Sequence, residues 1–408
     1  MVLTQSLFCL MLTVGGTVSA LPQPLRDSGI NLSIAAKLNF SGLTSIIEAD
    51  RARAHRLKNH VNLLGLAGGK RQTTNVDVTN GAVTYTATVN IGEPATDYTL
   101  LIDTGSSNTW VGAGKKYAPT SSSKDTGKAV SDTYGGGAFS GEEYTDKVDL
   151  GNGLVINSQS IGVANETSGF SGQDGILGIG PTDLTRGSIE GSDETVPTVV
   201  DNLASQGTIG SNAVGMFFAP YEEDASGVLT FGGADSSLYT GDLHYTSVTK
   251  TSPANQYWGV DQSISYGNTN ILSQNAGIID SGTSMILLAS DAYEAYQKAT
   301  GAAEDQRTGF LTLSKEQYGN LQPLNFNIGG NTFALSPNGQ IWPRSLNTAF
   351  GGDEDSVYLV IGDLGSQSGD GFDFINGYTF MERFYAVFDT TNSRIGLANT
   401  QYTNSESN

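Results

Sequence analysis

Two short segments each place an aspartate directly after an apolar strand and directly before a turn that contains glycine. The first is Thr99-Leu-Leu-Ile-Asp-Thr-Gly-Ser-Ser-Asn-Thr-Trp110, which holds Asp103. The second is Gly277-Ile-Ile-Asp-Ser-Gly-Thr-Ser284, which holds Asp280. One Asp-Thr-Gly sequence is often only a turn, but two copies in the same context indicate a duplicated half-site. Two such loops facing each other would place two carboxyl groups around one water.

Paired carboxyl groups can perform acid–base chemistry together. At a separation of about 3 Å they cannot both ionise easily, so they share one proton and titrate as a unit. The ionised partner can take a proton from a water that attacks a peptide carbonyl, while the protonated partner donates to the carbonyl oxygen. Gly105 and Gly282 would let the backbone approach closely. The hydroxyls that could hold the carboxylates belong to Thr104, Ser106, Ser281 and Thr283.

A third segment could cover this site. Ser131-Asp-Thr-Tyr-Gly-Gly-Gly-Ala-Phe-Ser-Gly141 has the strand–glycine–strand pattern of a mobile hairpin. Its tip, formed by Tyr134, Gly135 and Gly136, would exclude water from the cleft. An ordinary glycine-rich hairpin has the same pattern, so this segment read alone leaves both interpretations open.

The composition excludes several other mechanisms. After residue 71 the chain has no cysteine and a single histidine, His244, so a thiol nucleophile and a cysteine-based zinc site are impossible. His244 lies in a strand-like run and is expected to be structural. The chain has no glycine-rich phosphate loop with a following lysine, and we expect neither a metal nor another cofactor. A formal net charge of −20 argues against a nucleic-acid partner.

The first 71 residues differ from the rest of the chain. Residues 1–20 have the apolar core and small-residue end of a signal peptide, which predicts secretion, and no later stretch is apolar enough to suggest a membrane span. Residues 21–71 carry a formal +5, against −25 for residues 72–408. This contrast predicts a basic propeptide that ends at Lys70-Arg71, blocks the acidic cleft and is loosened when acid protonates the carboxylates. A Lys or Arg should lie near the two aspartates, and Lys58 is the candidate.

Residues 72–408 are numerous enough to form two lobes, each with its own core. Short alternating runs such as 83–90 and 143–150, separated by Gly, Asn and Ser, predict a mostly β structure. The clearest predicted helix spans residues 289–299. We place the lobe boundary after Pro220, which gives an N-terminal lobe at 72–220 and a C-terminal lobe at 221–408. Because one chain carries both half-sites, we expect a monomer.

The chain resembles the pepsin-type aspartic protease family over residues 72–408. The segments that carry the resemblance are Asp103-Thr-Gly-Ser-Ser-Asn-Thr-Trp110, Tyr134-Gly135 with Gly137, Asp174-Gly-Ile-Leu-Gly178, Asp280-Ser-Gly-Thr283, Arg383-Phe-Tyr-Ala-Val-Phe-Asp389 and Ile395-Gly-Leu-Ala398. Two further segments, Ile341-Trp-Pro-Arg344 and Phe374-Ile-Asn-Gly-Tyr-Thr-Phe-Met-Glu-Arg-Phe-Tyr385, are similar to a member from wood-decay fungi. The resemblance implies two pseudo-symmetric β-rich lobes with a cleft between them, where an extended polypeptide substrate binds under the flap.

The resemblance also implies roles by position. Asp103 and Asp280 would be the catalytic pair, Tyr134 the flap tyrosine and Trp110 its hydrogen-bond partner. A hydroxyl lock would join the loops through Thr104 and Ser281, while Ser106 and Thr283 would contact the carboxylates. Ile176-Leu177-Gly178 and Ile375-Asn376-Gly377 would lie behind the two loops.

Two departures from the family pattern bear on packing and specificity. Asn376 replaces an apolar residue in the second supporting segment, which puts the packing there in question. Gly136 stands where some fungal relatives carry an acid. Because the motifs supply Tyr134, Phe139 and Trp110 instead, we expect cleavage between apolar or aromatic residues.

Asn165-Glu-Thr167 is the only N-glycosylation sequon after residue 71. It falls in a polar stretch that we expect to lie between strands. Asn31 and Asn39 begin two more sequons in the propeptide.

The leading hypothesis is a secreted acid endopeptidase made as a zymogen. A binding or inhibitor protein on the same fold would be expected to lack one aspartate or to have a disrupted loop, and neither is seen. A glycosidase also uses two carboxylates, but it would not need them on twin Asp-Gly loops. Release of reducing sugar without peptide cleavage would support that alternative.

Overall fold

The computed structural model describes residues 29–38, 46–64, 83–135, 137–223 and 225–408. The predicted signal peptide, the Lys70-Arg71 processing site, Gly136 and the Asn39 sequon lie outside these residues.

Strands dominate the described chain, as the sequence predicts, and the largest sheet has 13 of them. In spatial order they are β11 (Thr240–Ser247), β23 (Arg394–Asn399), β22 (Phe384–Asp389), β9 (Ala213–Phe217), β10 (Gly227–Phe231), β1 (Ile30–Leu38), β2 (Val83–Ile91), β3 (Thr96–Asp103), β8 (Gly175–Gly178), β4 (Thr109–Val111), β7 (Val155–Ser168), β6 (Gly137–Asp149) and β5 (Lys124–Tyr134).

Two smaller sheets belong to the second half of the chain. The seven-stranded sheet has the order β18 (Asn331–Leu335), β17 (Leu324–Ile328), β12 (Gly259–Tyr266), β13 (Thr269–Ile279), β21 (Phe374–Asn376), β14 (Ile286–Leu288) and β20 (Ile361–Asp363). The three-stranded sheet has the order β15 (Ala303–Glu304), β16 (Leu311–Leu313) and β19 (Val357–Tyr358).

The helices of the described chain are few and mostly short. The α-helices are α1 (Ile46–Leu64), α2 (Val199–Ser205), α3 (Ser290–Thr300), α4 (Lys315–Gly319) and α5 (Tyr378–Met381). The 3₁₀ helices are η1 (Thr182–Thr185), η2 (Tyr221–Glu223), η3 (Ala254–Gln256), η4 (Asn338–Gln340) and η5 (Arg344–Phe350). The helix predicted at residues 289–299 is confirmed as α3. No helix among the described residues is long and apolar enough to cross a membrane.

The two aspartate loops have the same local topology. Asp103 is the last residue of β3, which pairs in parallel with β8, and β8 pairs antiparallel with the short strand β4. Asp280 directly follows β13, which pairs in parallel with β21, and β21 pairs antiparallel with the short strand β14. This repetition confirms the duplicated half-site that the sequence indicates. The predicted lobe boundary at 220/221 lies between β9 and β10 and stays a prediction.

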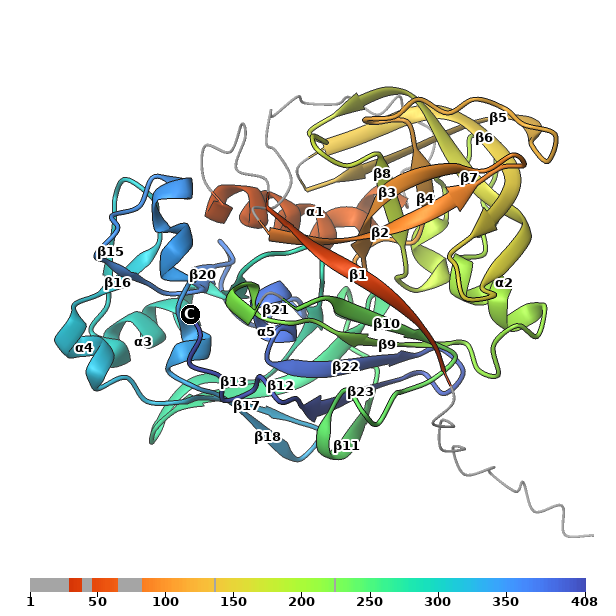
Figure 1. Cartoon of the computed structure of the whole chain (residues 1–408). Coiled ribbons are helices and arrows are strands. Elements are labelled where there is room, and N and C mark those ends of the chain that lie inside the picture. Colours follow the sequence, from red (N-terminus) through yellow and green to blue (C-terminus); the bar gives the residue numbers. More distant parts are fainter. Residues whose placement is uncertain (1–28, 39–45, 65–82, 136, 224) are drawn as a thin grey trace, which may run out of the picture.

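Strand β1, from the predicted propeptide, joins the two halves of the large sheet. Residues 30–34 pair with β10, and residues 35–38 pair with β2. Leu32 and Ile34 are buried, whereas Asn31 and Ser33, which alternate with them, are exposed, as the two-residue period of a strand requires. Figure 1 shows β1 running diagonally between the two halves of the molecule. Part of the predicted propeptide is therefore an interior element of the sheet.

A buried glutamate follows helix α5. Glu382 is 3% exposed and lies close to Tyr85 and Tyr378, each 2% exposed. Its Oε1 atom has no hydrogen-bond partner among the described residues. Burial raises the pKa of Glu382 from 4.5 to about 7, although the neighbouring Arg383 opposes this shift.

We predict that Glu382→Gln makes the stability less dependent on pH. The folded protein holds this proton up to about pH 7, whereas the unfolded chain loses it near pH 4.5. Glu382 therefore lowers the free energy of unfolding as pH rises through that window, by up to about 3 kcal/mol. Urea unfolding at several pH values measures this, in an Asp280→Asn background to avoid self-digestion. The exposed Glu316→Gln serves as the control, and equal pH slopes in the two variants would contradict the prediction.

Candidate active site

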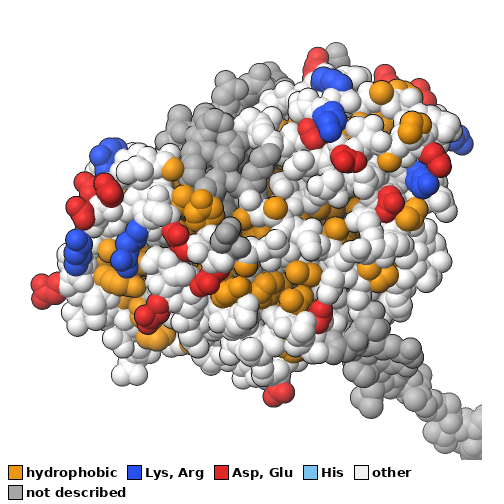
Figure 2. Space-filling model, in the orientation of Figure 1, with side chains coloured by type: hydrophobic (Ala, Val, Ile, Leu, Met, Phe, Trp, Pro, Cys, Tyr) orange, Lys and Arg blue, Asp and Glu red, His pale blue; other side chains and the backbone are white. Residues whose placement is uncertain are grey.

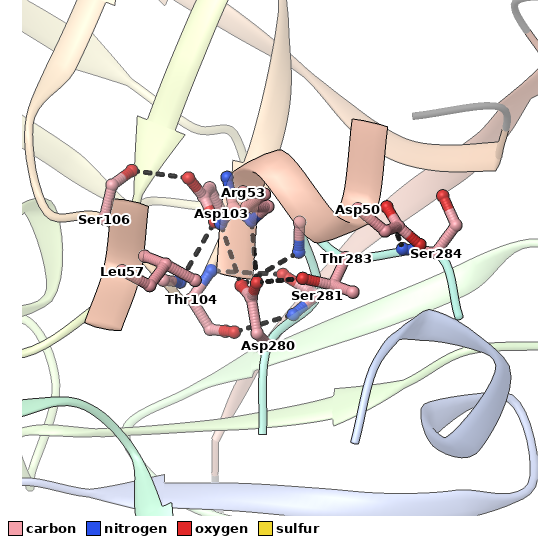
Figure 3. Close-up of polar contacts among 12 residues, drawn as sticks. Asp50, Arg53, Leu57, Asp103, Thr104, Ser106, Asp280, Ser281, Thr283 and Ser284 are labelled. Carbon is pink, nitrogen blue, oxygen red and sulfur yellow. Dashed lines mark hydrogen bonds and ion pairs between the residues drawn. The ribbon is translucent and has the colours of Figure 1, made fainter. Parts of the chain in front are cut away.

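The carboxyl groups of Asp103 and Asp280 are fully buried and face each other across the two loops (Figure 3). Asp103 Oδ1 accepts a hydrogen bond of 3.0 Å from the Gly105 amide, and Asp280 Oδ1 accepts one of 3.1 Å from the Gly282 amide. A Cβ atom on Gly105 would lie 2.5 Å from Asp280 Oδ1, and one on Gly282 would lie 2.6 Å from Asp103 Oδ1. Each glycine therefore leaves room for the carboxylate of the opposite loop.

Each carboxyl group also accepts a hydrogen bond from a hydroxyl three residues later. Ser106 Oγ donates to Asp103 Oδ2 and Thr283 Oγ1 donates to Asp280 Oδ2, both at 2.6 Å. Hydrogen bonds of this kind favour the ionised carboxylate. The predicted contacts of Ser106 and Thr283 are therefore present.

A reciprocal set of hydrogen bonds joins the two loops. The Thr104 amide donates to Ser281 Oγ at 3.1 Å, and the Ser281 amide donates to Thr104 Oγ1 at 2.9 Å. Each hydroxyl then donates across to a backbone carbonyl of the other half, Thr104 to Ile279 and Ser281 to Ile102. All of these atoms are buried. These bonds therefore fix the separation of the two carboxyl groups, and Ser281 supplies the hydroxyl that the lock requires.

One guanidinium group, that of Arg53 in helix α1, bridges both carboxylates. Its Nη2 lies 2.6 Å from Asp103 Oδ1 and 2.9 Å from Asp280 Oδ1, while its Nε lies 2.7 Å from Asp280 Oδ2. The Arg53 side chain is 3% exposed. Figure 3 shows helix α1 directing this side chain between the two aspartates.

The expectation that Lys58 lies near the pair is wrong. Its ammonium group contacts Ser366 Oγ at 2.9 Å and Asp370 Oδ2 at 3.1 Å, and Arg53 takes the position beside the aspartates. The reason is helical geometry, because the buried face of α1 includes Ile46, Asp50 and Arg53, at the three- to four-residue spacing of one helix face. Lys58 lies beside that face, at its margin with solvent.

The positive charge of Arg53 offsets part of the free-energy cost of burying the two carboxyl groups. Burial raises the pKa of Asp103, and the charge of Asp280 raises it further. Burial would also raise the pKa of Asp280, but its contacts with Arg53, followed by the bond from Thr283, lower that pKa overall. This asymmetry suits a pair that carries one proton and titrates as a unit.

A second charged residue of α1 is buried in the same region. Asp50 is 2% exposed, and its carboxylate accepts hydrogen bonds from the backbone amides of Ser284 at 3.1 Å and Met285 at 2.7 Å. Burial raises its pKa from 3.8 to about 7, although these two bonds oppose the shift. Asp50 and Arg53 thus anchor one turn of α1 to the second aspartate loop, at positions three residues apart.

Tyr134 ends β5 at the tip of the predicted flap hairpin and is 4% exposed. Trp110 lies beside the Tyr134 hydroxyl, as predicted, and its side chain opposes the rise in the pKa of Tyr134 that burial causes, although neither Trp110 Nε1 nor the hydroxyl has the geometry of a full hydrogen bond to a described residue. The two rings lie 6.2 Å apart, and Phe139 stacks on Trp110 at 4.5 Å, so ring packing holds this cluster. A Cβ atom on Gly135 would lie 2.0 Å from Arg53 Cα, so the flap tip lies directly against α1.

The segments expected behind the loops are in place. Residues 176–178 pair with β3, and Ile375 and Asn376 pair with Ile278 and Ile279 of β13. Asn376 is fully buried and exchanges two side-chain hydrogen bonds with Gln262, at 2.8 and 3.2 Å. A matching amide therefore satisfies the polar residue that departs from the family pattern. The sequence offers no signal for this partner, since Gln262 lies 114 residues away.

Two further expectations concern residues away from the aspartates. Asn165 is exposed but lies within β7, because this strand extends to Ser168 and does not stop before the sequon as expected. His244 lies in β11, with its ring 6.4 Å from that of Phe333. Among the described residues no three His, Cys, Asp or Glu side chains are arranged to hold a metal ion.

Comparison with known proteins places this geometry in a family. The chain matches the family model for eukaryotic aspartyl proteases over residues 84–400. The chain belongs to this family. Polyporopepsin of Irpex lacteus is 58% identical over 337 residues, which cover 82% of this chain and 99% of the relative. Pepsin A of Sus scrofa is 31% identical over 333 residues, which cover 77% of this chain and 80% of the relative.

The fold agrees with a solved structure of the family. The crystal structure of the aspartic proteinase from Irpex lacteus matches with a TM-score of 0.78 and 58% identity, over 80% of this chain and 96% of that one. The chain is therefore an aspartic endopeptidase with the bilobal pepsin-like fold, and the predicted similarity to a fungal member is confirmed. Membership of the aspartyl protease family also argues against the glycosidase alternative.

Proposed function

We propose that Asp103 and Asp280 are the catalytic pair of this aspartic endopeptidase. The observation that carries the proposal is the symmetric burial of the two carboxyl groups, each held by a glycine amide and a hydroxyl. With α1 displaced, the ionised carboxylate takes a proton from a bound water as the oxygen attacks the peptide carbonyl. The protonated carboxyl donates to the carbonyl oxygen, where negative charge develops. Because the pair needs one proton, activity is expected in acid.

We further propose that the chain is secreted and made as a zymogen, with residues 21–71 as an inhibitory propeptide. Arg53 supports this, since its guanidinium occupies the place between the aspartates that the attacking water requires. Arg51 and Lys58 add contacts from the same helix to Asp363 and Asp370. Figure 2 shows acidic side chains scattered over the face in view rather than gathered in one patch.

The proposed substrate is an extended polypeptide with apolar or aromatic residues next to the scissile bond. The side chains that support this preference are Tyr134 at the flap tip, with Leu184 and Tyr257 nearby. We propose a monomer, because both aspartate loops and their lock come from one chain.

Asp280→Asn should abolish turnover while the protein still folds, because the amide can neither share nor release the proton. Loss of acid–base function costs about 10²–10⁴-fold in rate, and we expect the upper end because the same group also holds the water. The measurement is kcat/KM on a peptide substrate, with the exposed Asp242→Asn as a control that should behave as the unaltered protein. A folded Asp280→Asn protein with undiminished activity would refute the catalytic assignment.

Arg53→Ala should weaken inhibition of the precursor, because it removes the charge that compensates both aspartates. Breaking a buried, hydrogen-bonded charge pair is costly, so conversion should be about tenfold faster or begin at higher pH. Gel analysis and intact mass of the full-length precursor would follow the appearance of an N-terminus near Gln72. Arg51→Ala is the matched control, since Arg51 is half-exposed and should matter little.

Two results would contradict this account of the precursor. One is conversion of Arg53→Ala and Arg51→Ala at the same rate and pH. The other is full activity at acid pH of a precursor that still carries Leu21.

We also propose Asn165 as an N-glycosylation acceptor, because its side chain is exposed on β7. Treatment of the secreted protein with an endoglycosidase should lower its mass, whereas an Asn165→Gln variant should lose that part of the change. A mass that treatment leaves unaltered would remove the proposal.

A further inference from the structure

The mature part of the chain contributes a carboxylate to the cleft that the catalytic pair does not use. Asp132 lies on β5, two residues before Tyr134, and is 8% exposed. Its Oδ2 accepts a hydrogen bond of 2.8 Å from the Asn108 amide group, and its Oδ1 accepts one of 2.7 Å from the Thr133 backbone amide. Asn108 is in turn fixed by Ser188 Oγ at 3.2 Å. Both donors to Asp132 are uncharged, so they orient the carboxylate without neutralising it.

This carboxylate lines a cavity of about 30 Å³ between the flap and helix α1. The cavity walls from the mature part include Ser106, Leu184 and Tyr257. After burial, the charge of Asp132 is the largest influence that raises the pKa of Tyr134, and it also raises that of Tyr257. The carboxylate therefore lies in the wall of this cavity, close enough to Tyr134 and Tyr257 for its charge to act on both.

Helix α1 of the proposed propeptide forms the opposite wall of this cavity. Arg56 and Leu57, one helical turn beyond Arg53, line the same cavity as Asp132. The Tyr257 hydroxyl donates to the Leu57 carbonyl at 2.8 Å, which fixes that turn of α1 against the mature part. The propeptide thus brings a basic side chain to the region of the Asp132 carboxylate, and removal of α1 opens this region to substrate.

We propose that Asp132 is a specificity-determining residue that selects a basic side chain, Lys or Arg, in the polypeptide substrate. The proposal rests on the proposed catalytic pair. Residues two apart on a strand are separated by about 6.6 Å, and an extended substrate advances by about half that per residue. Asp132 therefore faces a substrate position other than the two that flank the bond, and the apolar preference at those positions is unaffected.

The test uses peptides that share an apolar pair at the scissile bond and carry Lys, norleucine or Glu at each other position in turn. The unaltered protein should show one position where kcat/KM is highest with Lys and lowest with Glu, with Lys favoured over norleucine by about tenfold, as expected for a hydrogen bond between charged groups. In Asp132→Asn, which keeps an oxygen for the Asn108 bond, the Lys, norleucine and Glu peptides should be cleaved nearly equally. Asp125→Asn, an exposed aspartate on the same strand, is the matched control.

Any other outcome contradicts either this inference or the proposed function. If every peptide is cleaved but no position favours Lys over Glu, the inference fails while the proposed function stands. If the Lys preference survives in Asp132→Asn, or kcat/KM falls equally on all peptides, Asp132 only positions the flap. If Asp132→Asn does not fold, the position scan of the unaltered protein still tests the inference. A scan in which no position favours Lys over Glu would overturn it. No cleavage of any peptide by the unaltered protein would instead overturn the proposed function.

Discussion

Two carboxyl groups without solvent exposure face each other at the centre of the molecule, and burying such groups costs several kcal/mol each unless donors compensate. Each of the two aspartate loops supplies such donors to its own carboxylate. In both loops a strand end is followed by a glycine amide and then a hydroxyl at fixed spacing, so each carboxylate finds its donors within three residues. The lock between Thr104 and Ser281 then holds the two sets at one separation. The parallel pairing of β3 with β8 and of β13 with β21 fixes the strands behind them.

The same requirement explains why the proposed propeptide enters the cleft with charges as well as apolar side chains. Helix α1 covers an ionisable pair, and an apolar side chain there would leave the carboxylates without a counter-charge. Arg53 supplies that charge in a planar form that reaches both groups at once, which a lysine ammonium cannot match. Asp50 then occupies two backbone amides of the second loop that a buried helix would otherwise leave unpaired. The contacts that compensate the buried carboxylates are thus the same ones that the proposed inhibition would use.

The sequence predicts the parts of this arrangement that are local. Asp103, Asp280, their glycines and their hydroxyls are recognisable because all lie within a few residues of one another. The parts that stay hidden depend on residues far apart in the chain. Nothing in the sequence around Asn376 indicates that Gln262 is its hydrogen-bond partner. Asp132, in turn, looks like an ordinary residue of a glycine-rich hairpin. The period of a helix that begins at Ile46 places Arg53 on the buried face and Lys58 beside it. The strand that carries Asn165 extends further than its sequence predicts, since its polar residues resemble those of a loop.

Arginine keeps its proton throughout the range in which carboxyl groups titrate, so acid cannot release α1 by changing Arg53. Release must come from carboxylates that gain a proton. With Arg53 in contact the pKa of Asp280 is lowered, so its contribution to attachment is lost as pH falls through that lowered pKa. Asp50 has the opposite sign, because its pKa is raised from 3.8 to about 7 and its burial becomes less costly as pH falls through that interval. Attachment through these two groups therefore tightens in weak acid before it loosens in stronger acid. The lowered pKa of Asp280 therefore sets the pH below which the proposed propeptide helix can leave, while protonation of Asp50 opposes that release.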